Sequence, residues 1–174
     1  MTDIGIVGAG TAGLHLGLLL RQHDIPVTIY TDRTPGEIRD GRMINSVAHH
    51  NVTVARERAL GVDHWPLDEY GYVCHHHWVG GPDLFFRGDF AAPSRAIDYR
   101  IYQPTLMGDF EDRGGRIEYR SVEAADLEAL SAGHDALVVA SGKRSLGEFF
   151  GVRPEKSPYP QPMRRLMVGL WTGV

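Results

Sequence analysis

Residues 4–17, with the sequence IGIVGAGTAGLHLG, contain the motif that decides the fold of this chain. The apolar run Ile4–Val7 predicts a buried parallel strand, which breaks into Gly8-x-Gly10-x-x-Gly13 before a helical pattern begins. Gly8 permits the tight turn, Gly10 lets the backbone approach a pyrophosphate, and Gly13 lets the helix pack closely on the strand. A helix N-terminus directs free N–H groups at an anion, so the predicted dinucleotide site also includes Thr11 and Ala12.

The composition is that of one globular domain without a nucleic-acid partner. The 174 residues are 43% hydrophobic and 23% charged, and the net charge of −4 supplies no basic field for nucleic acid or an anionic membrane. No apolar run is long enough to span a bilayer, and the N-terminus is typical of a strand and not of a signal peptide. The single cysteine, Cys74, excludes an internal disulfide and fits a reducing cytoplasm. We interpret it as a small apolar strand residue, with a catalytic nucleophile as the alternative.

Charged residues follow the second predicted strand, Val27–Tyr30. In dinucleotide folds an acid at the end of this strand binds the adenosine ribose hydroxyls, and here Asp32 stands one place late, between Thr31 and Arg33. Arg33 could lie over the adenine or against a phosphate, and a solvated Asp–Arg pair is the alternative. Residues 34–42 are predicted to form a loop. Arg42 at its end is either a partner for the pyrophosphate or a surface arginine.

Two aromatic-rich runs, Tyr70–Val79 and Leu84–Gly88, surround a Gly-Gly-Pro turn and predict a β-hairpin. Alternation along the strand predicts two faces, with His75 and His77 on one and Tyr72, Cys74 and His76 on the other. Three consecutive histidines suggest a metal site, but no acidic or thiol partner stands at ligand spacing, so no metal is predicted. A concave sheet over an apolar ligand and a plain core sheet both fit the hairpin.

The remaining elements complete an α/β fold. Helices are predicted over Val52–Leu60, from Pro93 through Phe110 and over Val122–Leu130, and strands over Arg116–Tyr119 and Asp135–Gly142. The last strand ends in Ser141-Gly142, where a parallel sheet would again touch its nucleotide, and without a second GxGxxG motif a single dinucleotide is expected. We predict a nucleotide-binding core at about 1–50 and 95–150. The hairpin, at about 70–90, and a final strand, at about 164–174, are predicted to join a substrate-side sheet.

Together these features resemble the oxygenase component of two-component styrene monooxygenases, flavoproteins related to indole monooxygenases and aromatic hydroxylases. The resemblance covers essentially all 174 residues and rests on Gly8–Gly13, Thr31–Arg33, Arg42, the His-rich hairpin and Pro93–Arg100. The late acid after the second strand and Ser141-Gly142 in place of Asp-Gly are usual in this family. The resemblance implies a Rossmann-like FAD-binding domain, with Asn45 near the isoalloxazine ring and Gln103 approaching the flavin tail or ring.

Pocket positions separate the styrene and indole branches of the family. Those expected for styrene are Asn, Val, His, Tyr, His and Ser, and this chain has Asn45, Val47, His49, Tyr72, His75 and Ser94 at the matching places. The resemblance therefore favours styrene, although such a fingerprint can reflect ancestry more than turnover. An indole monooxygenase is the alternative.

The resemblance also implies the chemistry and the partners. An NADH-dependent flavin reductase supplies reduced FAD, and O2 adds at flavin C4a to give a hydroperoxide. Its distal oxygen passes to the vinyl group of a small aromatic alkene such as styrene, yielding an epoxide. The flavin carries the reaction, so no catalytic side chain is assigned, and the protein orients the reactants and excludes water.

Members of this family are much longer than this chain and return later with a Gly-Asp segment over the ribityl chain and most of the substrate sheet. We therefore expect an N-terminal portion that by itself binds FAD weakly or not at all and does not turn over. The alternatives are a catalytically inactive nucleotide-binding module, which could form a homodimer through an unpaired strand edge, and a nicotinamide dehydrogenase. The dehydrogenase is disfavoured because no catalytic His, Lys or Tyr-Lys pair follows the fold.

Overall fold

The computed structural model describes residues 2–43, 46–80, 84–142, 146, 153–161 and 163, with residues 46 and 47 described by their backbone alone. The helices and strands are β1 (Ile4–Val7), α1 (Thr11–Gln22), β2 (Val27–Thr31), α2 (Pro35–Arg39), β3 (Ser46–His49), α3 (Asn51–Leu60), α4 (Leu67–Tyr70), β4 (Gly71–Val79), β5 (Leu84–Asp98), α5 (Tyr99–Asp112), β6 (Arg116–Tyr119), α6 (Leu127–Ala132) and β7 (Ala136–Val139). Short 3-10 turns cover Ala124–Asp126 and Pro154–Lys156.

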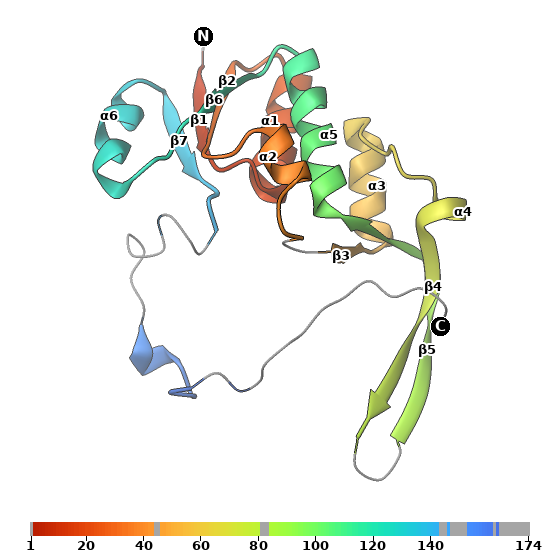
Figure 1. Cartoon of the computed structure of the whole chain (residues 1–174). Coiled ribbons are helices and arrows are strands. Elements are labelled where there is room, and N and C mark those ends of the chain that lie inside the picture. The colour runs from red at the N-terminus through yellow and green to blue at the C-terminus, as the bar shows by residue number, and fades with distance from the viewer. Residues whose placement is uncertain are drawn as a thin grey trace.

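A four-stranded parallel sheet, in the order β6-β2-β1-β7, forms the centre of the larger unit. Its register places Ile6 of β1 opposite Ile29 of β2 and Val138 of β7. Helices lie on both sides of this sheet, with α1 and α5 over one face and α6 beside β7 (Figure 1). The predicted Rossmann-like architecture and its parallel strands are confirmed.

Alternation along β1 divides the apolar core between the two faces of the sheet. Ile6 packs in a cluster with Leu14 and Leu18 of α1 and Phe110 of α5, all of them fully buried. Val7 points the other way and packs with a second cluster that includes Leu127 of α6. Strands β1 and β2 are thus each buried on both faces, as the apolar sequence of β1 predicts.

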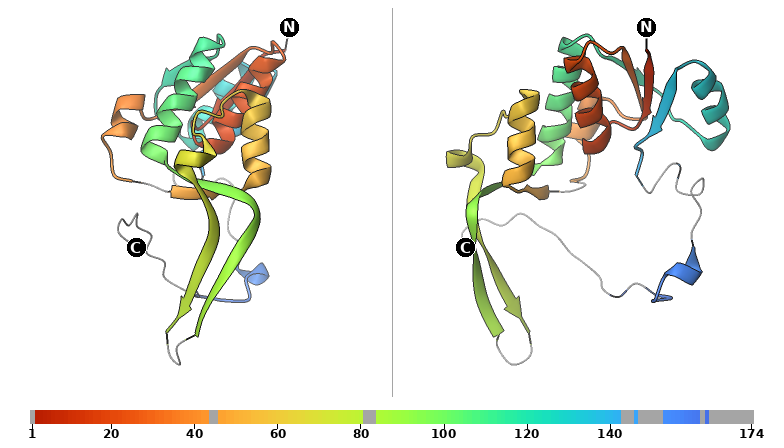
Figure 2. Two further views of the ribbon diagram at one scale, coloured as in Figure 1. Left: turned by 90° about the vertical axis from the view of Figure 1, so that its right-hand side faces the viewer. Right: turned by 180° about the vertical axis from the view of Figure 1, so that it is seen from behind.

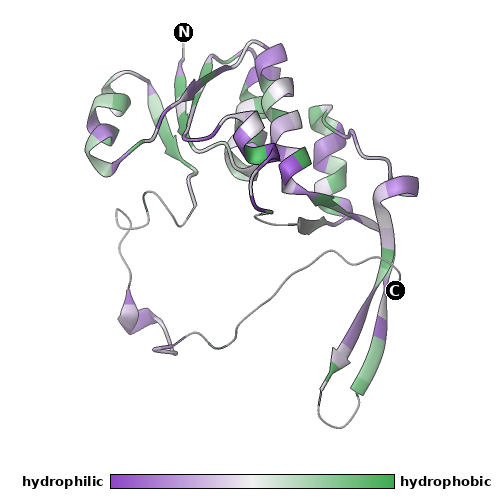
Figure 3. Ribbon diagram, viewed as in Figure 1, coloured by the Kyte–Doolittle hydropathy of each residue, from purple (hydrophilic) through white to green (hydrophobic). Residues whose placement is uncertain are grey.

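A second, antiparallel sheet has the order β3-β5-β4. The last residues of β5 pair with β3, and the rest of β5 pairs with β4 as a hairpin that extends away from the parallel sheet (Figure 2). Apolar side chains are exposed toward the tip of the hairpin, where Trp78 is 67% and Phe85 54% exposed (Figure 3). The predicted hairpin is confirmed.

Two sequence predictions about helices are wrong. Residues 34–42 do not form a loop throughout, because α2 lies within them; the Thr34 hydroxyl accepts a hydrogen bond from the Glu37 N–H, the Glu37 carboxylate accepts one from the Thr34 N–H, and Pro35 stands at the first helical position. The helix predicted from Pro93 begins only at Tyr99. Residues before it continue β5, and the Asp98 carboxylate caps α5 by accepting the Arg100 N–H at 2.9 Å.

The prediction that Tyr72 shares a face with Cys74 and His76 is also wrong. A register shift between Tyr72 and Cys74 interrupts the alternation of β4, as a β-bulge does. Tyr72 consequently stacks on His75, with ring centroids 5.5 Å apart. The final strand predicted at about 164–174 lies outside the described residues, and the predicted domain boundaries stay predictions.

A buried polar network joins the hairpin sheet to the parallel-sheet unit. Glu57 of α3 and Arg95 of β5 are both 0% exposed and form an ion pair, and Arg95 also donates to Asp63 and to the Trp65 carbonyl. The Glu57 Oε1 atom accepts hydrogen bonds from His49 Nδ1 at 2.7 Å and from the Tyr102 hydroxyl at 2.6 Å. The elements β3, β5 and α5 are therefore all bonded to one carboxylate on α3.

This arrangement determines the ionisation of Glu57. Burial by itself would raise the pKa of the carboxyl group, but hydrogen bonds from His49, Tyr102 and Arg95 outweigh it and lower the pKa to about 2. Since Tyr102 donates its hydroxyl proton to Glu57, the Nε2 of His15, 2.6 Å from the same hydroxyl oxygen, must donate to it. The network thus extends from α3 through α5 to α1.

Within the described residues, no helix is both long enough and apolar enough to cross a membrane.

Replacing Arg95 with Met should lower the free energy of unfolding by about 3–5 kcal/mol, because Glu57 would keep a buried charge without its cationic partner. A matched control is Arg87→Met on the same strand, since the Arg87–Asp89 pair is exposed and should contribute less than about 1 kcal/mol. Urea denaturation of the two variants measures both values. Equal losses would contradict the assignment of the buried pair as a stabilising junction.

The low pKa of Glu57 predicts a specific loss of stability in acid. The unfolded carboxyl has a pKa of about 4.3, so its folded-state stabilisation is fully present above that pH and is lost as the pH falls toward the folded value of about 2. Glu57→Gln removes the titrating group. The difference in free energy of unfolding between the original chain and this variant should be larger at pH 6 than at pH 3, and a difference independent of pH would refute the prediction.

Candidate dinucleotide-binding site

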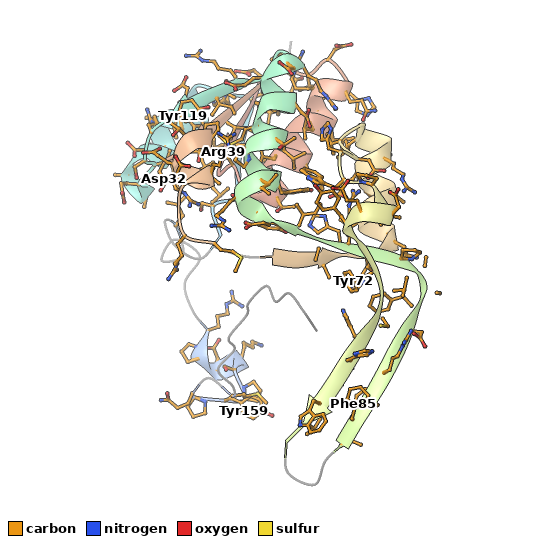
Figure 4. The ribbon with its side chains drawn as sticks, turned by 45° about the vertical axis from the view of Figure 1, so that its right-hand side comes forward. Asp32, Arg39, Tyr72, Phe85, Tyr119 and Tyr159 are labelled. Atoms are coloured by element: carbon orange, nitrogen blue, oxygen red, sulfur yellow. The ribbon has the colours of Figure 1, made fainter. Side chains whose placement is uncertain are left out.

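A cavity of about 640 Å³ lies at the carboxyl ends of β1, β2 and β7 and at the N-terminus of α1. The carboxyl edge of a parallel sheet is where dinucleotide folds bind their ligands. Figure 4 shows Asp32, just past β2, and Tyr119, at the end of β6, on one side of the parallel-sheet unit, away from Phe85 on the hairpin. The volume is within the usual range for a small-molecule pocket.

Each of the three motif glycines has a distinct environment. Gly8 has a φ of +113°, a conformation that side chains disfavour, and a Cβ there would lie 2.7 Å from the Ala140 carbonyl oxygen. At Gly13 a Cβ would lie 2.0 Å from the Gly8 carbonyl oxygen, so the approach of α1 to the turn requires glycine. At Gly10 nothing lies within 4 Å of the Cβ position, which leaves open space where a ligand's phosphates would approach the backbone.

The electrostatics of the cavity favour an anion. No acidic residue occupies the first turn of α1, so the positive end of the helix dipole is not neutralised there. Arg33, Arg42 and Arg120 line the cavity, together with the carboxylate of Asp32. The Arg33 Nε atom lies 3.9 Å from Asp32 Oδ1, and the side chains are 44% and 70% exposed. Such an exposed ion pair is weak, so both side chains remain available to bind a ligand.

A buried hydroxyl in the cavity wall supplies a further test of fit. Ser141 follows β7 and lines the cavity, and its Oγ is buried with no hydrogen-bond partner among the described residues. Buried polar atoms normally have a partner. Together with the open space at Gly10 and the arginines, this unpaired hydroxyl fits a diphosphate-containing ligand.

Most of the predicted cofactor residues meet at this cavity: Gly8, Gly10, Thr31, Asp32, Arg33, Arg42, Gln103, Ser141 and Gly142. Three others, Thr11, Ala12 and Gly13, form the first turn of α1 without lining the cavity. Asn45 lies outside the described residues. The assignment of individual residues to parts of the cofactor stays a prediction.

Several lining residues were not predicted from the sequence: Tyr30, Ile38, Arg120, Ser121 and Val122 are the main ones. The segment 120–122 follows β6, which pairs in parallel with β2, so its first residue lies beside the end of β2. The carboxyl ends of neighbouring parallel strands share one edge of the sheet, but the sequence does not show that β6 is the neighbour of β2. Ile38 belongs to α2, in the segment that the sequence analysis assigned to a loop.

The predicted substrate residues that the structure describes lie on the three strands of the antiparallel sheet, and their role in a substrate pocket stays a prediction. His49 is 2% exposed and bonded to Glu57, within the buried network. Ser94 is 1% exposed, and its hydroxyl lies 2.7 Å from His50 Nδ1. Tyr72 lies opposite Ser94 in the register of β4 and β5, and His75 follows on β4. Asn45 is outside the described residues, as is the side chain of Val47.

An aromatic surface does form around Tyr72 and His75. Phe90 packs against both, with centroid distances of 5.5 Å to Tyr72 and 4.7 Å to His75. His50 packs on Phe90 at 5.5 Å, held by its contact with Ser94. Ser94 therefore adjoins this surface both as the cross-strand neighbour of Tyr72 and through its contact with His50. In the described part of the chain, no group of three His, Cys, Asp or Glu side chains is placed to hold a metal ion.

Gly13→Ala should destabilise the fold, because the added Cβ would collide with the Gly8 carbonyl and displace α1 from the turn. The matched control is Gly108→Ala in α5, where nothing lies within 4 Å and the substitution should add up to about 1 kcal/mol of stability. Thermal unfolding followed by circular dichroism compares the two. If both variants had the same melting temperature, the required close approach at Gly13 would be refuted.

Comparisons with known proteins agree with this geometry. No protein-family profile matches the chain. It is 57% identical over 172 residues to styrene monooxygenase StyA from Pseudomonas sp and 56% identical over 172 residues to styrene monooxygenase StyA from Pseudomonas fluorescens. Each match covers 98% of this chain and 41% of the relative, so the chain spans about two fifths of the length of these relatives. The resemblance expected from the sequence is confirmed over that region.

Solved structures share the fold at much lower sequence identity. The tetrameric form of 2-methyl-3-hydroxypyridine-5-carboxylic acid oxygenase matches with a TM-score of 0.56 and 16% identity, covering 68% of this chain and 31% of that one. PqsL from Pseudomonas aeruginosa, described as a probable FAD-dependent monooxygenase, matches with a TM-score of 0.51 and 14% identity, covering 67% and 32%. At these identities the likeness concerns the fold alone.

Proposed function

We propose that this chain forms the FAD-binding part of a flavin-dependent monooxygenase of the styrene monooxygenase type. The observation that carries the proposal is the glycine turn at the cavity, with open space at Gly10 and a backbone too close at Gly13 for any side chain. The 57% identity to a styrene monooxygenase supports a flavin over other dinucleotides. The arginines and the unpaired Ser141 hydroxyl fit the charge and the oxygen atoms of a pyrophosphate.

The residues of this chain bind and orient the cofactor. The N–H groups at the start of α1 and Arg42 would hold the pyrophosphate, and Asp32 would accept hydrogen bonds from the adenosine ribose. Gln103 on α5, which lines the cavity and is 8% exposed, would approach the flavin portion. Bound FAD, once reduced, supplies the chemistry that activates O2. No side chain is assigned a proton-transfer role.

The substrate, the partner and the location belong to the same proposal. We propose that an NADH-dependent reductase delivers reduced FAD in the cytoplasm and that the whole protein epoxidises styrene or a related vinyl aromatic. The support is the name of the relatives and the surface of Tyr72, His75 and Phe90, whose rings suit an aromatic ligand. An indole monooxygenase is the second candidate, since the same aromatic surface suits a bicyclic ring. A catalytically inactive nucleotide-binding module is the third, and it requires only the cavity.

FAD binding tests the proposal directly. Gly10→Val should abolish binding while leaving the fold intact, since the side chain would occupy the open space above the turn without touching protein atoms. Gly36→Val is the control, because Gly36 also has nothing within 4 Å but does not line the cavity. Flavin fluorescence measures affinity, and circular dichroism verifies folding. Equal FAD affinity in the Gly10 variant and the original chain would refute the pyrophosphate assignment.

Adding chemically reduced FAD, O2 and styrene or indole to the chain separates the remaining candidates. Styrene oxide would support the epoxidase and also show that this length of chain suffices for turnover. Indole oxidation without styrene oxidation would favour the second candidate. FAD binding without either product is the result expected of a chain that spans about two fifths of its relatives, and it agrees with the first and third candidates alike.

A further inference from the structure

The order of the strands assigns a direction to a dinucleotide in the cavity. The glycine turn, where a pyrophosphate would lie, follows β1, and Asp32, where a ribose would lie, follows the adjacent β2. The next strand in the same direction is β6. A dinucleotide that continues past the ribose must therefore place its adenine beside the residues that follow β6, the segment 120–122.

Arg120 begins that segment and is held in place by its backbone and its side chain. Its N–H donates to the Thr31 carbonyl at 2.7 Å, which anchors it at the end of β2. Its guanidinium carbon lies 5.6 Å from the centre of the Tyr30 ring, and its Nη2 lies 3.9 Å from Asp126 Oδ1. The side chain lines the cavity and is 43% exposed, so the face of the guanidinium away from Tyr30 remains accessible.

The ring beneath Arg120 is itself fixed. Tyr30 is 6% exposed, and its hydroxyl lies 2.8 Å from His134 Nε2. The other nitrogen of His134 lies 2.9 Å from an Asp3 carboxylate oxygen. A planar cation on a buried ring that is hydrogen-bonded at its far end forms a rigid platform.

We infer that Arg120 is the residue that binds the adenine ring, by stacking its guanidinium between Tyr30 and the base. This inference rests on the proposed function and assigns to one residue the preference for an adenine dinucleotide over a flavin mononucleotide. Planar guanidinium groups stack on aromatic rings, whereas the ammonium group of lysine is not planar and does not stack. The recognition is consequently one of shape and not of charge.

Arg33 is the competing residue for this role, and the structure favours Arg120. Arg33 also lines the cavity, but its one ionic contact given by the structure is the 3.9 Å approach to Asp32. Its side chain is 44% exposed, and no aromatic ring in the described part of the chain stacks against it. A long side chain without such support loses more conformational entropy on binding a ligand than one already held against a ring.

Binding of FAD, ADP and FMN to four versions of the chain tests the inference. Isothermal titration calorimetry or ligand-observed NMR would compare the original chain with Arg120→Ala, Arg120→Lys and the control Arg116→Ala. Arg116 begins β6, the strand that leads to Arg120, but it does not line the cavity, and it pairs with Glu118 on the surface. Both Arg120 variants should bind FAD and ADP about tenfold more weakly with FMN binding unchanged, and the control should bind all three normally.

Four results would overturn the inference, the last of them together with the proposed function. Unchanged FAD and ADP affinity in Arg120→Ala would show that the base lies elsewhere. Normal FAD and ADP affinity in Arg120→Lys would show that the residue acts by its charge. An equal loss of FMN affinity in Arg120→Ala would show that the residue does not recognise the adenine. If the original chain bound neither FAD nor ADP, the proposed function would fail and the inference with it.

Discussion

The fit of α1 against the turn after β1 is the constraint on which the binding site depends. At Gly13 the helix comes so near the Gly8 carbonyl that a single methyl group would stand 2.0 Å from its oxygen. That proximity aims the first N–H groups of α1 into the cavity, and the positive φ of Gly8 turns the chain out of the sheet to allow it. The turn is closely packed at Gly13 but leaves open space at Gly10. The three motif glycines therefore serve both the packing of α1 and the binding of a ligand.

A second constraint links this site to the rest of the chain. The carboxylate of Glu57 connects α3, β5 and α5, so the hairpin sheet cannot move independently of the helix that carries Gln103. A buried ion pair offers little net stability compared with apolar packing, but its directional bonds fix one arrangement of the segments. In this chain they fix the base of the hairpin relative to the wall of the dinucleotide cavity.

The fold and the glycine site could be predicted because their signals are local. The strand, the turn and the helix follow one another within residues 4–22, and the apolar run before Ser141 identifies the strand that meets the same edge. The role of Arg120 depends on β6 pairing with β2, a contact across almost ninety residues that no local pattern reveals. The bulge that turns Tyr72 toward His75 is equally invisible to an argument from strict alternation. The helix α2 is different, because its capping box, Thr34 with Glu37, was legible in the sequence beside the Pro-Gly pair that suggested a loop.

The positions of the branch fingerprint divide physically into two groups. Tyr72 and His75 present their rings on the hairpin, whereas His49 and Ser94 are buried and act on their neighbours. Ser94 orients His50 against Phe90, and His49 helps to hold the carboxylate that binds Arg95. A change at either buried position would therefore act on the aromatic surface of Tyr72, His75 and Phe90 through the groups that these two side chains contact.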